Sequence, residues 1–342
     1  MTRVLHVSEA FGGGVATAII AYASNSPWAE HHLLMNVRQD GVIELPPDHP
    51  FKSVSVLPKS GMSAIRRIRS AYRDIGPDVV HLHSSFAGLY GRLAGLPRHR
   101  LIYTPHGYSF ENPKEPRLSR AAFYLAEQML SLFGGRFAGV GPHECKISEG
   151  MIGARDVSLL PNFALIPSHL SPVKTDFQKR PLRGAMIGRL TPVKDPEFFL
   201  DTWRFVRERT NHIEFVWIGG GDDEMTEKMV RAGIELTGWV TPEEVLSFLR
   251  RMDFYVHTSA SEGNPMSVLE AAALELPIVA RDIPALRALG LQVLGKTPSD
   301  LAGKIVGLLE ADAMSAAKDD SARLRQRFSR ERQVAALQSL YC

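Results

Sequence analysis

The sequence predicts an α/β protein made of two doubly wound domains, each with a parallel sheet covered by helices on both faces. Its 342 residues exceed what one core usually organises, so two domains of about 150 residues each are expected. Short apolar strands alternate with amphipathic helices in both halves, which is typical of parallel sheets. An irregular stretch with several prolines, 163–182, lies between the two series.

These observations give the expected domain organisation. We predict an N-terminal domain over residues 1–165, a linker over 166–182 and a C-terminal domain over 183–325. The remaining segment, 326–342, holds a helix that is a candidate for packing back against the N-terminal domain. The stretch between the domains could equally be an irregular loop within one of them.

The first half begins with a strand at Val4–Val7, which runs through glycines 12–14 into a helix at Val15–Tyr22. This order of strand, glycine turn and helix is typical of a nucleotide-type α/β domain. Further strands are expected at His32–Val37, Val54–Leu57, Asp78–His83, Leu101–Thr104 and Phe137–Val140, and further helices at Ser63–Ile75 and Leu118–Phe133.

The same alternation restarts in the second half. Strands are expected at Gly184–Gly188, Glu214–Ile218, Ile234–Leu236, Phe254–His257 and Ile278–Ala280. Helices are expected at Glu197–Arg209, Glu224–Ala232, Glu243–Arg251, Pro265–Leu274, Asp300–Glu310 and Arg330–Tyr341. Since ligands of such sheets bind outside the carboxyl ends of the strands, we expect loops of both domains to face one central cleft.

The composition excludes several classes of protein. With 44% hydrophobic and 23% charged residues the chain is globular, and a net charge of +3 gives no nucleic-acid signal. Cys145 and Cys342 lie far apart, so neither a disulfide framework nor a zinc site is expected. The longest apolar run, Val15–Ala23, is shorter than the roughly 20 residues of a spanning helix. We expect a soluble cytoplasmic protein without a signal peptide, and leave peripheral membrane contact open.

The most informative stretch is 257–270, which leaves a strand and enters a helix. Asn264 is a good N-cap, and Pro265 suits the first helical position. The backbone N–H groups of Met266 and Ser267 would then point outward, unpaired, at the positive end of the helix dipole. The stretch therefore predicts an anion-binding site.

Acidic side chains flank this helix start. Glu262 precedes the helix and Glu270 lies inside it. Because an ionised carboxylate accepts hydrogen bonds from paired hydroxyls, two such groups suit a hydroxyl-rich ligand. The alternative is a capped helix with two solvated glutamates.

Arg189 and Lys194 lie in one loop after the first strand of the second domain. Arginine can bind a phosphate with two hydrogen bonds, and lysine acts as a compact point charge, so the pair suits a diphosphate. The alternative is a pair of surface cations.

Together these stretches resemble the retaining glycosyltransferases of family 4, the group 1 glycosyl transferases, which have the GT-B fold. The hallmark of that family is a glutamate pair with seven residues between, here Glu262 and Glu270, preceded by a loop of the type found at 188–194. Segments 78–83, 104–107, 157–162 and 270–280 also look like the family, in the expected order, so the resemblance covers most of the chain.

The resemblance implies a role for each matching residue. Arg189 and Lys194 would hold the diphosphate of a nucleotide-sugar donor, Glu270 the ribose hydroxyls, and Glu262 the sugar hydroxyls. The implied catalytic residues are Arg189, Lys194, Glu262 and His106, and the implied donor-binding residues are Gly13, Gly14, Gly263, Asn264, Pro265, Met266, Ser267 and Glu270.

Three histidines lie in or just after predicted strands of the first domain. His106 matches the family histidine that faces the donor sugar, and its alternative is a structural histidine at a strand end. His83 is a weaker candidate near the same rim, whereas His81 alternates away from it and is expected to be structural.

The implied reaction moves a sugar from a UDP- or GDP-linked donor to a hydroxyl of a saccharide or lipid-linked saccharide, with retention, in polysaccharide or glycoconjugate synthesis of the bacterial cell-surface type. No metal and no other cofactor is expected, since arginine and lysine supply the charge and no Asp-x-Asp motif occurs. The alternatives are a non-catalytic partner subunit that binds a nucleotide sugar, or another GT-B enzyme such as a nucleotide-sugar epimerase.

The chain departs from the family pattern at three places. Segment 217–222 keeps the glycine-rich turn of the family but continues into Asp223 and Glu224. Glu275 stands where the family usually has glycine, and Arg281–Ala285 replaces its usual Gly-Gly loop. That loop could shape the nucleotide or acceptor side.

The predicted helix Ser63–Ile75 is basic, and more arginines follow it. Basic residues on an amphipathic helix favour an anionic membrane surface. The alternative is an ordinary solvated helix face. The arginines concerned are Arg66, Arg67, Arg69, Arg73, Arg92, Arg98 and Arg100.

Overall fold

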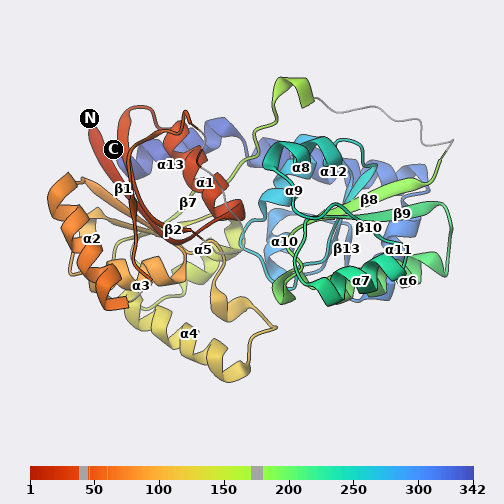
Figure 1. Cartoon of the computed structure of the whole chain (residues 1–342), viewed down its shortest axis with the longest axis horizontal. Helices are drawn as coiled ribbons and strands as arrows, with labels where there is room; N and C mark the ends of the chain where they lie inside the picture. Colours follow the sequence, from red (N-terminus) through yellow and green to blue (C-terminus); the bar gives the residue numbers. More distant parts are fainter. Residues whose placement is uncertain (38–44, 46, 60, 171–179) are drawn as a thin grey trace. The chain divides into compact units, whose positions relative to one another are not determined.

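The computed structural model describes residues 1–37, 45, 47–59, 61–170 and 180–342, which form two compact units (Figure 1). Unit 1 comprises Met1–Asn162 and Ser329–Cys342, and unit 2 comprises Phe163–Phe328. Each unit is built on its own parallel sheet, so the predicted doubly wound α/β class is confirmed. Part of the predicted linker, 171–179, lies outside the described residues, while Ile166 and Leu170 pack into the core of unit 2.

Unit 1 holds a seven-stranded sheet of order β3-β2-β1-β4-β5-β6-β7. All neighbouring strands in it run parallel. The strand order reverses beside β1, so the loops after β1 and β4 open at the topological switch point, where doubly wound sheets bind ligands. The strands are β1 (Thr2–Phe11), β2 (Ala29–Val37), β3 (Phe51–Val56), β4 (Val79–His83), β5 (Leu101–Thr104), β6 (Arg136–Gly139) and β7 (Val157–Leu159).

Helices cover both faces of this sheet. One face packs against α2 (Gly61–Ile75) and α3 (Ser85–Leu93), with α4 (Arg117–Ser131) on the same side (Figure 1). The other face packs against α1 (Gly13–Ser24) and α13 (Arg330–Tyr341), which joins unit 1 although it ends the chain. The short helix α5 (Pro142–Glu149) follows β6.

Helix α3 was not predicted, because its glycines obscure the helical pattern. A Cβ at Gly88 would lie 2.4 Å from the Tyr103 ring, and one at Gly91 would lie 2.2 Å from Leu82. The glycines therefore let α3 approach β4 and β5 closely, at the cost of helix propensity.

Unit 2 holds a six-stranded parallel sheet of order β10-β9-β8-β11-β12-β13. One face packs against α6, α7 and α11, and the other against α8, α9, α10 and α12. The strands are β8 (Leu182–Ile187), β9 (Ile213–Ile218), β10 (Glu235–Leu236), β11 (Phe254–His257), β12 (Ile278–Arg281) and β13 (Leu294–Gly295). The helices are α6 (Pro196–Arg207), α7 (Asp223–Arg231), α8 (Pro242–Leu249), α9 (Met266–Ala273), α10 (Pro284–Leu289), α11 (Pro298–Gly307) and α12 (Ala311–Arg327).

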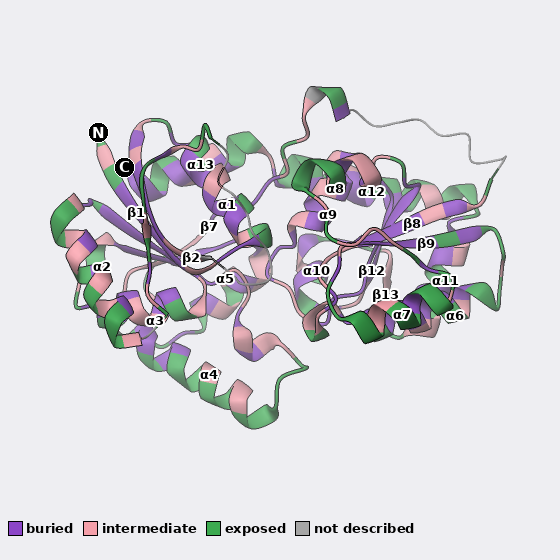
Figure 2. Ribbon diagram, in the orientation of Figure 1, coloured by how far each residue is buried: buried purple, intermediate pink, exposed green. Residues whose placement is uncertain are grey.

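Figure 2 shows the central strands of both units buried and the outer faces of the surrounding helices exposed, while strands β3, β7 and β10 are largely half-buried or exposed. Helix α12 was not predicted because it buries little apolar surface: Ala317 and Leu324 are its buried apolar residues, beside Asp320 and Ser321. No helix in the described part of the chain has an apolar stretch long enough to cross a membrane.

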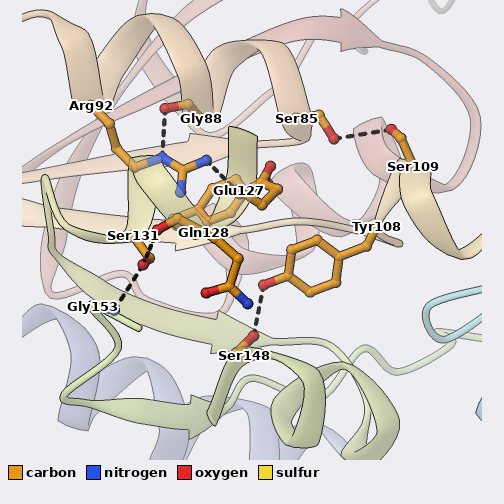
Figure 3. Close-up of polar contacts among 11 residues, drawn as sticks. Ser85, Gly88, Arg92, Tyr108, Ser109, Glu127, Gln128, Ser131, Ser148 and Gly153 are labelled. Carbon is orange, nitrogen blue, oxygen red and sulfur yellow. Dashed lines mark hydrogen bonds and ion pairs between the residues drawn. The ribbon is translucent and has the colours of Figure 1, made fainter. Parts of the chain in front are cut away.

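Arg92 corrects one expectation, because it is not part of a basic surface. Its side chain is completely buried, with Nη2 2.8 Å from Oε2 of Glu127, and Nε donates to the carbonyl of Gly88 (Figure 3). Tyr103 donates its hydroxyl to the other oxygen of Glu127, and the guanidinium lies over the Tyr103 ring. The pair ties α3 to α4 across β5.

We expect Glu127→Ala to destabilise the protein by about 3–5 kcal/mol, because it leaves the Arg92 charge buried without its carboxylate. The double variant Arg92→Met/Glu127→Leu removes both charges and should lose much less. Chemical denaturation followed by circular dichroism compares the two variants. A double variant as unstable as the single one would contradict this account.

Candidate active site

The predicted acidic and basic residues of unit 2 meet at one edge of its sheet. Strands β8, β11 and β12 are neighbours, so their carboxyl ends open at the same edge. Lys194 ends a short 3₁₀ turn after β8, and Glu262 lies between β11 and α9. The Lys194 Nζ is 2.6 Å from Oε1 of Glu262. Two segments far apart in sequence thus supply one ion pair.

Backbone and side-chain bonds hold the turn that carries Lys194. Ala260 donates its N–H to the carbonyl of Val193 at 2.8 Å, which ties the turn to the loop after β11. Asp195 adopts a left-handed conformation with φ 51° and accepts from Nη1 of Arg281 at 2.6 Å. The Arg281 guanidinium also lies over the Phe198 ring, 4.2 Å from its centre. Arg281, where the chain departs from the family pattern, therefore braces the residue next to Lys194.

The loop that carries Arg189 packs against the glycine turn after β9. Leu190 donates its N–H to the carbonyl of Gly220 at 2.9 Å, and Trp217 donates Nε1–H to the carbonyl of Gly188 at 2.8 Å. Gly219 has φ 137°, and a Cβ there would lie 2.1 Å from the Gly188 carbonyl oxygen. Only glycine fits at 219 without displacing the loop before Arg189.

Glu262 is ionised in this site. Burial acts to raise its pKa, but Lys194 and His257 overcome that effect and hold the pKa well below the usual range. Nε2 of His257 lies 3.3 Å from Oε1 of Glu262. Sequence reasoning gave His257 no role, although its place at the last residue of β11 was a usable signal.

Helix α9 differs from its prediction at the first residue. The helix runs over Met266–Ala273 with Pro265 as its N-cap, so Asn264 lies before the helix and its side chain does not cap it. The reason is that Pro265 has an extended ψ of 123°. The first N–H groups of α9, those of Met266 and Ser267, still lack intrahelical acceptors, which is what the predicted anion site requires.

Glu270 is half-buried in the second turn of α9. Burial raises the pKa of its carboxyl to about 7, although Lys194 lowers it in part. The group therefore changes charge near neutral pH. Gly263, Asn264, Pro265 and Ser267 are buried, and Met266 is half-buried.

The predicted residues of unit 1 follow β1 and β5. Gly13 and Gly14 are exposed in the first turn of α1, and Gly13 has φ 53° with open space where a Cβ would lie. The backbone conformation, not crowding, requires glycine at Gly13. His106 follows β5 with φ 54°, and Glu144 holds this loop by accepting from the N–H of Gly107 at 2.8 Å.

Two further histidines, both completely buried, lie on β4 of the same unit. Nε2 of His106 is 3.1 Å from Nδ1 of His83, which is completely buried and so is not at the rim where it was expected. His81 contacts Thr104 and Tyr341 inside the unit, so it has the structural role predicted for it. It does not alternate away from His83, however: residues two apart on a strand share a face, and the two ring centres are 4.0 Å apart.

Comparison with known families gives two matches. The model described as "Glycosyl transferase 4-like domain" matches residues 3–138. The model described as "Glycosyl transferases group 1" matches residues 182–311.

Among known proteins, a UDP-Gal:alpha-D-GlcNAc-diphosphoundecaprenol alpha-1,3-galactosyltransferase of Escherichia coli is 27% identical over 233 residues. That match covers 60% of this chain and 58% of the E. coli protein. An uncharacterized 41.2 kDa protein in the cps region of Klebsiella pneumoniae is 23% identical over 304 residues, covering 83% of this chain and 82% of that protein.

Solved structures share the fold over nearly the whole chain. HepE of Anabaena, crystallised with UDP and glucose, has a TM-score of 0.77 at 15% identity and 99% coverage of both chains. A sucrose-phosphate synthase from Thermosynechococcus elongatus has a TM-score of 0.78 at 14% identity, covering 100% of this chain and 98% of that one. These similarities place the two units in the GT-B fold.

Proposed function

The chain belongs to the group 1 glycosyl transferases, with a glycosyl transferase 4-like domain in its N-terminal half, and we propose that it transfers a sugar from a nucleoside diphosphate to a saccharide hydroxyl with retention. Its family and its relatives support a glycosyltransferase of GT-B type that acts in polysaccharide synthesis. The observation that supports the proposal most is the contact of Lys194 with Glu262 beside the first turn of α9.

Each group then has a chemical task. Breaking the bond to the sugar leaves negative charge on the diphosphate, which Lys194, Arg189 and the N–H groups of α9 would stabilise. Ionised Glu262 would accept hydrogen bonds from sugar hydroxyls, and Glu270 from the ribose. In a same-face attack, an oxygen of the leaving diphosphate would help to take the acceptor proton.

The relatives favour a uridine diphosphate sugar over a guanosine one as donor. The E. coli relative is named for UDP-galactose and for a saccharide on diphosphoundecaprenol, and HepE crystallised with UDP. A lipid-linked saccharide is accordingly the acceptor that we propose.

A donor screen followed by a transfer assay tests the function. Thermal shift with UDP- and GDP-sugars should show stabilisation by uridine donors, since a ligand of the native state raises the melting temperature. UDP release that depends on an acceptor, with a product of retained anomeric configuration, is the expected result. Conversion of the donor sugar without acceptor would indicate an epimerase. Binding without turnover would indicate a non-catalytic subunit.

We propose that the transfer needs no metal, because Arg189 and Lys194 supply the charge that a divalent ion would bring. Activity should therefore change by less than about twofold when a chelator is added. Losing one group that stabilises the developing charge would lower the rate far more, by roughly a hundred- to a thousandfold. Steady-state rates with excess EDTA, and with Mg²⁺ restored, measure this. Loss of activity in EDTA and its recovery with Mg²⁺ would refute the prediction.

We also propose that unit 1 contacts an anionic membrane through α2 and α4. Arg66 and Arg73 of α2 are exposed. On α4, Leu118 is 83% exposed and Leu125 62% exposed. Exposed basic side chains on α2 and exposed apolar side chains on α4 suit a negatively charged lipid surface, which attracts each basic residue by about 1 kcal/mol.

Arg66→Glu/Arg73→Glu should lower binding to anionic vesicles by roughly tenfold or more, since it removes two attractive charges and adds two repulsive ones. Sedimentation with vesicles of anionic and of zwitterionic lipid measures the bound fraction. Arg204→Glu/Arg207→Glu on α6 makes the same charge change in unit 2 and should leave binding nearly unchanged. Equal losses in the two double variants would contradict the proposed surface.

A further inference from the structure

A row of hydrogen-bonded imidazoles crosses the sheet of unit 1. His31 lies on β2, His6 on β1, His83 on β4, and His106 follows β5. These strands are consecutive in the sheet. Nδ1 of His31 is 3.1 Å from Nε2 of His6, Nδ1 of His6 is 3.0 Å from Nε2 of His83, and Nδ1 of His83 is 3.1 Å from Nε2 of His106. We call these residues the histidine row.

His6, His31 and His83 are buried on the sheet face covered by α1 and α13, and His106 is half-buried. His6 and His83 are fully buried and His31 is 3% exposed, while the Tyr22 ring of α1 stacks on His83 and His106. Burial lowers the pKa of each imidazole, that of His106 to about 3. At neutral pH every member is therefore neutral, with one nitrogen that donates and one that accepts.

At the His31 end of the row, the contacts with Ser26 determine which ring nitrogen of His31 donates. The Ser26 hydroxyl donates to the carbonyl of Tyr22 at 2.6 Å, so its oxygen is left as an acceptor. Nε2 of His31 lies 3.0 Å from that oxygen and 3.1 Å from the Ser26 carbonyl. Both neighbours of this nitrogen accept, so it must carry the proton, and Nδ1 of His31 must accept.

The position of the proton on His31 determines which nitrogen is protonated on each of the other histidines in the row. Because Nδ1 of His31 accepts, Nε2 of His6 donates, and Nδ1 of His6 accepts in turn. The same rule makes Nε2 of His83 a donor and its Nδ1 an acceptor, so Nε2 of His106 must donate. Nδ1 of His106 is left with a lone pair, and within the described residues it has no protein partner.

We propose that the Ser26 carbonyl, acting through His31, His6 and His83, locks His106 as its Nε2–H tautomer, so that Nδ1 accepts a hydrogen bond from a hydroxyl of the bound sugar donor. The first three histidines are then positioning residues. The identity of the ligand hydroxyl rests on the proposed function, whereas the tautomer does not. An acceptor at this place selects a hydroxyl and rejects a group that only accepts.

The loop around His106 supports this role. Glu144 accepts from the N–H groups of Gly107 and Val140, at 2.8 and 2.7 Å, and so fixes the backbone in which His106 has positive φ. The ring therefore meets the row in one orientation.

A metal ion is the competing occupant of this cluster. Within the described residues, His6, His81 and His83 offer nitrogens that lie within 4.8 Å of one another. In the structure, however, those of His81 are bonded to Thr104 and Tyr341, and those of His6 and His83 to the row. Binding an ion would break the row, so the same experiment separates the two states.

Nitrogen-15 NMR of the histidine-labelled, ligand-free protein reads the tautomers directly. Two-bond proton–nitrogen correlations should show the Nε2–H pattern for His6, His31, His83 and His106 at neutral pH, each assigned with a single His→Gln variant. An Nδ1–H pattern, a charged imidazole or a metal-bound shift at any of the four would overturn the proposal.

Variants of His31 test the coupling to His106, which lies at the other end of the row. His31→Phe should release the His106 tautomer and lower kcat/KM by roughly three- to tenfold, the effect of one hydrogen bond. His31→Gln, which can donate to Ser26 and accept from His6, should keep the Nε2–H pattern of His6, His83 and His106 and the wild-type rate. His32→Phe alters the neighbouring strand residue, whose ring contacts Ser53 and Glu30, and should leave the row unchanged.

The outcomes separate the two proposals. Four Nε2–H patterns without sugar transfer would refute the proposed function and leave the lock in place. Sugar transfer with an unlocked His106 would refute the lock alone. If His31→Phe does not fold, the wild-type spectrum and His31→Gln still decide.

Discussion

Lys194→Ala is expected to lower kcat by roughly a hundred- to a thousandfold, the usual cost of removing one group that stabilises developing charge. Lys194 stands on a turn that is pinned to the loop after β11, with Nζ 2.6 Å from Glu262. A cation that is already in place needs little reorganisation when the diphosphate leaves, so its loss should act on the chemical step.

The same substitution also changes Glu262. Burial alone would raise the pKa of this carboxyl, and Lys194 is the strongest influence that opposes it. Without Lys194 the pKa of Glu262 should rise, which adds a second fall in kcat/KM at acidic pH to the fall below about pH 7 that Glu270 gives the wild type. Arg189→Ala should match the loss of kcat without this pH effect.

Lys228→Ala is the matched control for Lys194→Ala. Lys228 is paired with Glu197 at 2.5 Å in the same unit, but both side chains are more than 40% exposed. Its replacement should leave kcat unchanged, because an exposed ion pair contributes little. Near-normal turnover in both Lys194→Ala and Arg189→Ala would remove the basis of the active-site assignment.

The sequence predicted the architecture because alternating strands and helices leave a clear hydrophobic period. Two of the helices it missed, α3 and α12, lack that period for physical reasons. Helix α3 uses Gly88 and Gly91 to approach the sheet, and α12 buries polar Asp320 and Ser321. Close packing and buried polar groups are decided by tertiary contacts, which a single segment does not reveal.

The sequence was enough to predict the charged residues of the candidate site, but not the residues that support them. Glycine turns, helix starts and paired charges marked Lys194, Glu262 and Glu270 in the sequence. Arg281 and His257 were missed as supports, since their partners, Asp195 and Glu262, come from other segments. The wrong N-cap at Asn264 has a local cause, because the proline after it took that position itself.

Glu270→Gln is expected to weaken donor binding by roughly ten- to a hundredfold at pH 8, the range for hydrogen bonds to a charged group. Because burial raises the pKa of Glu270 to about 7, the wild-type carboxylate loses its charge as the pH falls through neutrality. Donor kcat/KM of the wild type should therefore fall below about pH 7, and the variant should show no such inflection. An unchanged pH profile in the variant would show that another group titrates.

The same variant should be more stable than the wild type at pH 8. Below an ordinary pKa of 4.5 both states of Glu270 are protonated, and between 4.5 and about 7 only the unfolded state loses its proton, so stability falls as pH rises. A neutral amide avoids this cost, which amounts to about 3 kcal/mol above pH 7. Thermal unfolding should thus show a gain of several degrees at pH 8 that vanishes near pH 4.

Glu262→Gln should respond in the opposite direction, which makes it the matched control. The pKa of Glu262 is held below its ordinary value, so its ionised form stabilises the fold above that value and the benefit disappears in acid. At pH 8 the Glu262 variant should melt below the wild type and the Glu270 variant above it. Two shifts of the same sign would contradict the charge assignments at this site. Opposite shifts, with weaker donor binding in both variants, would mean that Glu270 destabilises the free enzyme in order to bind its donor.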